Sequence, residues 1–203
     1  MKIAILGATG RTGSLILQHA LDAGHTVRAL VRSPGRLRVS HPNLEALHGD
    51  ARESRDVARL VAGCDGVISA IGPVDGHNNI CSVATENVIA AGAKRYVVVS
   101  GAALDLPGDR KEMADKAISF VVRTLTLEAF KDKVHEHALL EASGLAWTAL
   151  RPPRLTDDPA EAPARANLER LLSGSVSRDA LAAFALATLT DDTWLRRAPF
   201  VSA

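Results

Sequence analysis

The sequence MKIAILGATGRTGS, residues 1–14, joins a short apolar run to three glycines spaced three residues apart. Residues 2–6 have the composition of a buried strand, and residues 15–21 predict a helix. A strand, a glycine turn and a helix in this order are the context of a dinucleotide-binding fingerprint. We therefore expect a dinucleotide cofactor to lie against residues 7–13.

Each glycine of this turn has its own expected task. Gly7 permits a sharp turn off the strand, Gly10 lets the backbone approach a pyrophosphate, and Gly13 lets the helix lie close to the strand. The free N–H groups and the dipole of the helix then favour the phosphate charges. The first gap is one residue longer than in the commonest form of the fingerprint, so a glycine turn without a ligand is the alternative. The cofactor contacts expected here are Gly7, Thr9, Gly10, Arg11, Thr12 and Gly13.

The composition limits the classes of partner. The 203 residues are 47% hydrophobic, which suits one domain over residues 1–203. A net charge of +1 gives no electrostatic basis for binding nucleic acid or an acidic membrane. Cys64 and Cys81 form no disulfide framework and no metal spacing, so we expect both in the core and no metal site. With no signal peptide and no membrane-spanning stretch, we expect a cytoplasmic protein.

Apolar strands alternate with helical segments along most of the chain. This alternation predicts an α/β fold with a doubly wound, mostly parallel sheet between two layers of helices, and a ligand at the switch point between strands one and four. Four prolines within residues 152–166 predict an ordered loop or a mobile lid, and residues 152–203 are expected to cover the substrate. The candidate strands are 2–6, 26–31, 44–48, 66–70, 95–100, 147–150 and 199–202, and the candidate helices are 13–22, 54–62, 80–91, 111–127, 131–142 and 177–189.

Arg32 follows the second predicted strand, where an NAD site carries an acid that binds the ribose hydroxyls. No acid lies between residues 22 and 45, so we expect Arg32 to bind a 2′-phosphate and the cofactor to be NADP(H). Arg11 is placed to approach the same phosphate from the glycine turn. For Arg36 and Arg38, a solvated surface charge is the preferred interpretation.

The ends of strands three, four and five supply further candidates. Asp50 either meets the adenine through its carboxylate or a neighbouring amide, or caps the helix that begins near residue 54. Gly72 lets the backbone pass close to the ribose, or is only a turn residue. Ser100 lies near the nicotinamide end, or is a turn or cap residue. The cofactor contacts expected at these ends are Asp50, Ala51, Ala70, Ile71, Gly72, Ser100 and Gly101.

Several motifs together resemble a known family. They are Gly7 to Gly13, Arg32, Gly49-Asp50, residues 70–72, Ser143-Gly144-Leu145 and Arg151-Pro152-Pro153. The chain is similar to the atypical short-chain dehydrogenase/reductases, and within them to the NAD(P)H-binding, NmrA-like branch that includes flavin reductases. The resemblance implies a Rossmann fold with NADP across the strand ends, and it covers nearly the whole chain.

The resemblance also implies roles near the nicotinamide. It places His137, Pro153 and Arg154 there, with Pro152 beside the cofactor, and the expected catalytic residues are Ser100, His137 and Arg154. The Tyr-x-x-x-Lys pair of carbonyl-reducing relatives is missing, because the one tyrosine, Tyr96, begins strand five and should lie far from the cofactor edge. Gly101 replaces a serine of the flavin reductase.

These observations favour an NADPH-dependent reductase of a small-molecule acceptor such as a flavin, a quinone or a similar delocalised ring. Such an acceptor needs no dedicated tyrosine acid, because its reduced form spreads the negative charge over a ring system. A cofactor-binding redox sensor without turnover is the alternative, and an epimerase or dehydratase is the third interpretation. We expect a monomer or a weak homo-oligomer.

Overall fold

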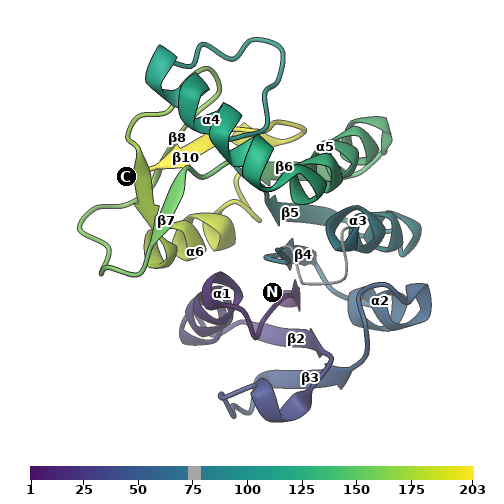
Figure 1. Cartoon of the computed structure of the whole chain (residues 1–203). Coiled ribbons are helices and arrows are strands. Elements are labelled where there is room, and N and C mark those ends of the chain that lie inside the picture. Colours follow the sequence, from purple (N-terminus) through teal and green to yellow (C-terminus); the bar gives the residue numbers. More distant parts are fainter. Residues whose placement is uncertain (73–78) are drawn as a thin grey trace.

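A computed structural model describes residues 1–72 and 79–203 of the chain. Its centre is a six-stranded parallel sheet in the order β3-β2-β1-β4-β5-β6 (Figure 1). The strand order reverses between β1 and β4, which confirms the predicted doubly wound sheet and its switch point. The strands are β1 (Lys2–Leu6), β2 (Thr26–Val31), β3 (Leu44–His48), β4 (Gly66–Ser69), β5 (Arg95–Val99) and β6 (Ala146–Leu150).

Helices cover both faces of the sheet, so the predicted three-layer architecture is confirmed (Figure 1). On one face α1 packs against α6, and on the other α3 packs against α2 and α5. Alternate residues of β1 serve the two layers, because Ile3 and Ile5 belong to one apolar cluster and Ala4 and Leu6 to the other. The helices are α1 (Arg11–Asp22), α2 (Ser54–Val61), α3 (Ile80–Ala90), α4 (Met113–Leu125), α5 (Leu127–Ala142) and α6 (Arg178–Ala187).

The segment after β6 contains four short strands. The sequence analysis predicted the last of them, at residues 199–202, and assigned residues 152–166 to a loop. β7 (Arg154–Thr156) pairs in parallel with β9 (Ser175–Ser177), and β8 (Arg165–Asn167) pairs with β10 (Phe200–Ser202) in antiparallel fashion. The loop prediction for residues 152–166 is therefore wrong in part. Strands of three residues are too short to show a periodic pattern, and these depend on partners distant in sequence.

The chain between β5 and β6 also differs from the expectation. The predicted gap between two helices at residues 128–130 is absent, because α5 starts at Leu127 directly after the single residue Thr126, whose φ is −126° and ψ 41°. Two short 3-10 turns, η1 (Pro34–Arg36) and η2 (Asp192–Trp194), complete the elements. Among the residues that the structure describes, no helix has the length and apolar character needed to cross a membrane.

Candidate functional site

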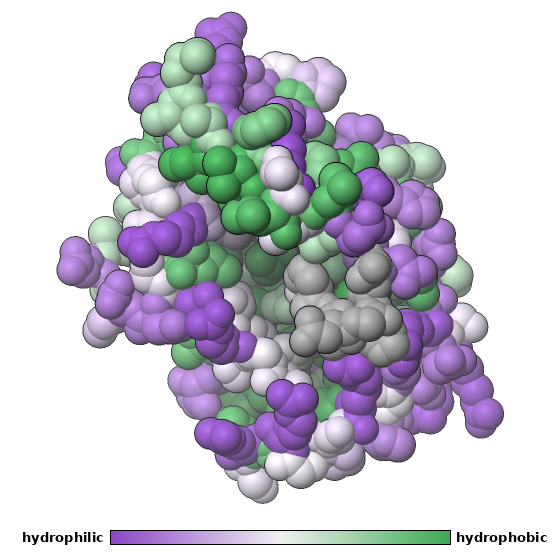
Figure 2. Space-filling model, in the orientation of Figure 1, coloured by the Kyte–Doolittle hydropathy of each residue, from purple (hydrophilic) through white to green (hydrophobic). Residues whose placement is uncertain are grey.

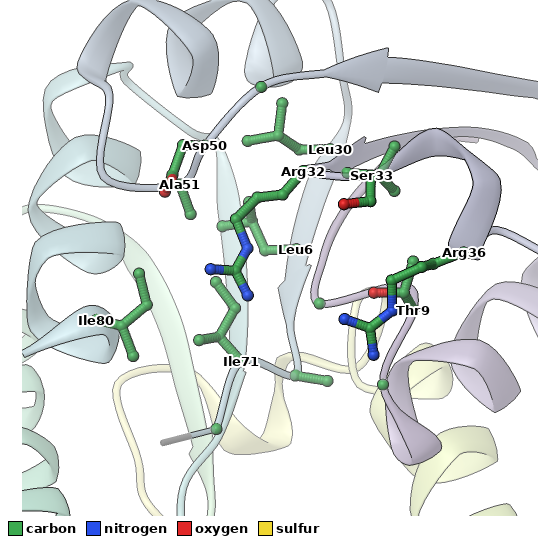
Figure 3. A pocket seen from close by; sticks show the side chains of 16 residues that line it. Leu6, Thr9, Leu30, Arg32, Ser33, Arg36, Asp50, Ala51, Ile71 and Ile80 are labelled. Atoms are coloured by element: carbon green, nitrogen blue, oxygen red, sulfur yellow. The ribbon is translucent and has the colours of Figure 1, made fainter. Parts of the chain in front are cut away.

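A cleft of about 670 Å³ lies where β1, β2, β3 and β4 end (Figure 3). It brings together residues from the glycine turn and from the ends of four strands, as the switch point requires. Predicted contacts that line it are Gly7, Thr9, Gly10, Arg32, Asp50, Ala51, Ala70, Ile71 and Gly72, and lining residues that the sequence analysis did not select are Leu6, Leu30, Val31, Ser33, Arg36, Gly49 and Ile80.

The backbone of the glycine turn packs so closely against its neighbours that two of its glycines leave no space for a side chain. Gly7 has a φ of +81°, and a Cβ there would lie 2.8 Å from the carbonyl of Ala70. A Cβ on Gly13 would overlap the carbonyl oxygen of Gly7, because α1 passes directly over the turn. The Gly10 N–H donates to the Gly7 oxygen at 2.9 Å and closes the turn. Both the strand end and the helix start are thereby fixed at the cleft.

The start of α1 is suited to an anion. Gly10 is its N-cap residue, no side chain caps the helix, and its first turn contains no acid. The first amides of α1 are therefore available to a ligand, and the helix dipole favours a negative charge there. This open helix start beside a glycine-rich turn fits a pyrophosphate.

Two guanidinium groups extend into the cleft from the segment after β2. Figure 3 shows Arg32 beside Asp50 and Ile71, and Arg36 beside Thr9. Arg36 is exposed, as the interpretation of a solvated surface charge expects, but it also lines the cleft, because η1 turns the chain back toward the glycine turn. Sequence proximity to Arg32 and the Pro34 turn signal were the available clues. The two cations form a positive end of the cleft.

The acid of the cleft is already paired. Asp50 accepts a hydrogen bond from the Arg52 guanidinium at 2.6 Å and another from the Arg52 N–H at 3.0 Å. These bonds hold the pKa of Asp50 below its usual range. The alternative that Asp50 caps the next helix is wrong, since Glu53 is the N-cap residue of α2. The negative charge of Asp50 in the cleft is therefore balanced by the Arg52 guanidinium.

The other arginines of this region make different contacts. Arg28 donates to Glu45 at 2.8 Å and to carbonyls at the end of α2, so it holds β2 to its neighbours. Arg11 pairs with Asp157 at 3.1 Å, and both side chains are largely exposed. Arg11 and Arg38 line a second, smaller cavity of about 350 Å³, which shares Thr9, Gly10 and Arg36 with the cleft. Thr12 and Gly13 line neither cavity.

The segments that leave β5 and β6 run side by side. The Ser100 N–H donates to Leu150 O at 2.8 Å, and the Ala102 N–H donates to Pro152 O at 2.9 Å. The Ser100 hydroxyl is buried and has no hydrogen-bond partner among the described residues. An unpaired buried hydroxyl at the carboxyl edge is a group that a ligand can satisfy. It thus fits the predicted place of Ser100 near a nicotinamide.

Gly101, Pro152, Pro153 and Arg154 continue these two segments. Gly101 follows Ser100, Pro152 is buried between the segments, and Arg154 is exposed at the start of β7. None of the four lines the cleft at the β1–β4 ends. Their roles at the nicotinamide stay predictions. The short loop expected at residues 73–79 falls almost wholly outside the described residues.

His137 is placed in the interior of the molecule. Its ring packs edge to face on Trp147, with 5.5 Å between centroids, and burial lowers its pKa. Trp147 is the second residue of β6, so this contact lies toward the amino end of the sheet. The role near the nicotinamide that the resemblance gives His137 stays a prediction, and this placement does not support it.

A buried polar group on α5 reaches the carboxyl edge instead. Lys133 donates to Val99 O at 3.0 Å and to Glu136 at 2.9 Å. Glu136 in turn accepts from Thr85, whose hydroxyl lies 3.0 Å from that of Tyr96. Tyr96 is the second residue of β5, as predicted, and is fully buried beside Trp147; burial raises the pKa of its hydroxyl.

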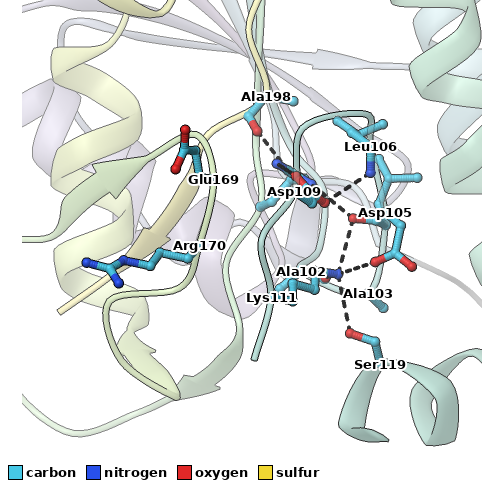
Figure 4. A network of polar contacts seen from close by, with 12 residues as sticks. Ala102, Ala103, Asp105, Leu106, Asp109, Lys111, Ser119, Glu169, Arg170 and Ala198 are labelled. Carbon is cyan, nitrogen blue, oxygen red and sulfur yellow. Dashed lines mark hydrogen bonds and ion pairs between the residues drawn. The ribbon is translucent and has the colours of Figure 1, made fainter. Parts of the chain in front are cut away.

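A second polar network ties the segment after β5 to β6 and β10 (Figure 4). Arg151, nearly buried, donates to both carboxylate oxygens of Asp109 at 2.7 and 2.8 Å and to Ala198 O at 2.7 Å. Lys111 donates to Asp105 at 2.6 Å and to the Ser119 hydroxyl at 3.3 Å. The network fixes residues 102–111 and the start of α4 at the carboxyl edge of the sheet.

Comparisons with known proteins agree with this geometry. A chloroplastic protein of Arabidopsis thaliana is 28% identical over 206 residues, covering 94% of this chain and 72% of the relative. A protein of Bacillus subtilis described as an uncharacterized sugar epimerase, YhfK, is 28% identical over 212 residues, covering 98% and 92%. The structure of ChuY, an anaerobillin reductase from Escherichia coli O157:H7, has a TM-score of 0.83 at 19% identity and covers 100% of this chain and 97% of its own, which shows a shared fold.

A family model also covers most of the chain. The model is described as NAD(P)H-binding and matches residues 7–192, from the glycine turn to beyond α6. The open helix start and the close packing at Gly7 and Gly13 are what such a cofactor requires. The predicted cofactor class is confirmed, and the chain belongs to the NAD(P)H-binding family.

Proposed function

We propose that the protein is an NADPH-dependent reductase that transfers hydride to a flavin, a quinone or a similar delocalised ring. The observation that carries this proposal is the position of Tyr96. It is the single tyrosine of the sequence, and its hydroxyl is buried against Thr85. The chain thus offers no tyrosine acid at the cofactor edge, which suits an acceptor that needs none.

The preference for NADPH rests on Arg32 and Arg36. Both line the cleft, while the carboxylate that faces them, Asp50, is occupied by Arg52. A 2′-phosphate between two guanidinium groups gains charge-assisted hydrogen bonds that a bare ribose hydroxyl cannot make. NADH would leave both cations without that partner.

The bound cofactor supplies a hydride. With one proton from solvent, a quinone becomes a hydroquinone and the cofactor leaves as NADP⁺, so two electrons and two protons reach the acceptor. The protein lowers the barrier by holding two flat rings face to face, which converts a bimolecular encounter into a positioned one. The Ser100 hydroxyl, buried and unpaired among the described residues, is available to orient the ring nearest β5.

Steady-state oxidation of NADPH with a panel of acceptors tests the proposal. We expect turnover with free flavins or quinones and little or none with simple ketones. Reduction of ketones with flavins and quinones left untouched would contradict the proposed mechanism. Tight NADPH binding without turnover of any acceptor would instead favour a redox sensor.

An epimerase is a second candidate because one full-length relative is described as a sugar epimerase. Epimerases of sugar nucleotides also hold a nicotinamide cofactor, but they oxidise a hydroxyl and need a base beside it. The burial of Tyr96 speaks against that chemistry here. Conversion of a sugar nucleotide into its epimer, measured with NADP⁺ bound, separates the two functions.

A further inference from the structure

Helix α4 carries its apolar side chains on the outside. Met113, Ile118, Val121, Val122 and Leu125 are 41–80% exposed and lie within one half of the helix surface at 100° per residue. We call these five residues the α4 face. An amphipathic helix of a globular protein normally buries such a stripe, so its exposure marks a binding surface.

The other half of α4 carries the exposed Phe120 and the polar side chains by which the protein holds the helix. Ser119 is the buried residue of this helix and accepts from Lys111. Arg123 donates to Ala103 O at 2.9 Å and pairs with Asp105. These polar contacts fix the orientation of α4, so the α4 face points away from the core.

Connectivity places α4 at the ligand edge of the sheet. The chain leaves β5 at the carboxyl edge after Val99, and it returns there when Lys133, near the start of α5, reaches Val99 O. The segment between begins and ends at this edge, and Arg123 holds α4 to Ala103, the neighbour of Ala102 that pairs with Pro152 there. The helix therefore lies near the carboxyl edge, where the switch-point cleft also opens. Figure 2 shows an apolar surface over α4 directly above the hollow on this face of the molecule.

The chemistry of the surface restricts what it can hold. The α4 face presents only aliphatic and thioether side chains. The two basic residues of the helix, Lys116 and Arg123, lie outside this face, and Arg123 is engaged with Asp105. A phosphate-bearing flavin nucleotide gains nothing there, because its charge finds no cation. A chain of methylenes gains from removing both surfaces from water.

We propose that the α4 face binds the alkyl or prenyl chain of the acceptor, so that the acceptor is a lipophilic quinone whose ring lies beside Ser100. This inference rests on the proposed function and narrows its acceptor class. The hydride and proton balance is unchanged, since the chain takes no part in the reaction. The contacts of Lys111 and Arg123 then hold α4 so that the α4 face lies beside the reacting ring.

Two measurements test this inference on the full chain. The first is kcat/KM for quinones that share one ring and differ in alkyl length, from no chain to about ten carbons. Burial of two to three methylenes corresponds to a roughly 10- to 100-fold rise, so we expect at least a tenfold increase for the long chain. The second is binding of the apolar dye anilinonaphthalene sulfonate, followed by its fluorescence and by displacement with the long-chain quinone.

The test variant is Ile118→Gln with Leu125→Gln, and the control is Val134→Gln. Val134 is an exposed apolar residue of α5 outside the α4 face. All three positions are exposed, so the variants are expected to fold, which circular dichroism checks. The double variant should lose the dependence of kcat/KM on chain length and most of its dye binding. Its kcat/KM for the quinone without a chain should stay within about twofold of the wild-type value. The control should behave as the wild type.

The outcomes separate the two proposals. Turnover that does not depend on chain length, or a dependence that survives in the double variant, overturns the α4 inference and leaves the reductase intact. Dye displacement by long-chain quinones without any turnover supports the α4 site and refutes the reductase. If the double variant only converts a dimer into a monomer by light scattering, with the chain dependence kept, the α4 face is a contact between two copies and the inference is wrong.

Discussion

Arg151 and Asp109 form a two-pronged ion pair that is almost completely withdrawn from water. Two guanidinium nitrogens lie 2.7 and 2.8 Å from the carboxylate oxygens, and the side chains are 2% and 7% exposed. The guanidinium also stacks on the Phe200 ring, 3.8 Å from its centroid. One contact therefore joins the segment after β5 to β6 and to the C-terminal strand β10.

The first prediction concerns the stability that this pair controls. Asp109→Asn leaves the Arg151 charge buried without its counter-charge, which typically costs about 3–5 kcal/mol. For a chain of this size the melting temperature should fall by about 2–4 °C for each kcal/mol. The control is Glu128→Gln, because the exposed pair of Glu128 with Lys131 should contribute less than about 1 kcal/mol. Urea unfolding of both variants measures the two losses in free energy of unfolding. Equal losses would contradict the conclusion that burial makes the Arg151–Asp109 pair important for stability.

The second prediction concerns cofactor choice. Arg32→Ala and Arg36→Ala should each weaken NADPH binding by about 10- to 100-fold, because each removes a charge-assisted hydrogen bond worth roughly 1.5–3 kcal/mol. Binding of NADH should change by no more than about threefold. Titration of both cofactors measures this, with Arg38→Ala as the control outside the cleft. If NADH weakens as much as NADPH, the arginines do not bind the 2′-phosphate.

The third prediction concerns the tyrosine. Tyr96→Phe should keep near-normal NADPH oxidation with a flavin or quinone, because its hydroxyl lies 3.0 Å from Thr85 in the interior. The loss of that buried hydrogen bond should instead lower the free energy of unfolding by about 1 kcal/mol. Parallel rate and urea measurements separate the effects. A rate loss of about 10²–10⁴-fold, the usual effect of removing a catalytic acid, would show that Tyr96 takes part in the reaction.

The fourth prediction concerns His137 and pH. Burial lowers its folded-state pKa below the ordinary value of 6.5, while the nearby Glu141 opposes the shift. The imidazole of His137 is therefore protonated more readily in the unfolded chain than in the folded protein. The free energy of unfolding should then decrease as pH falls below about 6.5. His137→Gln removes this titration. Urea unfolding between about pH 7.5 and 5.5 should show a smaller decrease for the variant, and equal slopes would mean that His137 titrates normally.

His137→Ala also tests the role that the family resemblance assigns. Because the ring packs on Trp147 in the interior, NADPH oxidation should fall by less than the 10²–10⁴-fold that loss of a catalytic acid brings. The variant opens a cavity beside Trp147, so its activity is compared at a temperature well below its own melting point. A full catalytic loss with an intact fold would restore His137 to the active site.

Much of the fold could be predicted because its signals are local. The apolar run at residues 2–6, the glycines behind it and the helix that follows determine one βα unit through hydrogen bonding and burial within a few residues. Repetition of such units, joined by right-handed crossovers, then leads to the sheet order that the structure has. The same local signals located Arg32 and Asp50 in the cleft, because the ends of parallel strands meet at one edge.

The sequence by itself determined the six strands of the main sheet, most of the helices, and the dinucleotide site behind β1, because those features depend on neighbours along the chain. Tertiary structure alone decided that Arg36 turns into the cleft, that His137 is buried on Trp147 and that β7 to β10 pair. It also decided that α4 exposes its apolar half. The pattern of α4 predicts a buried stripe, but Lys111, Asp105 and Arg123 bind its polar side, so contacts between distant residues determine which side of this helix meets water.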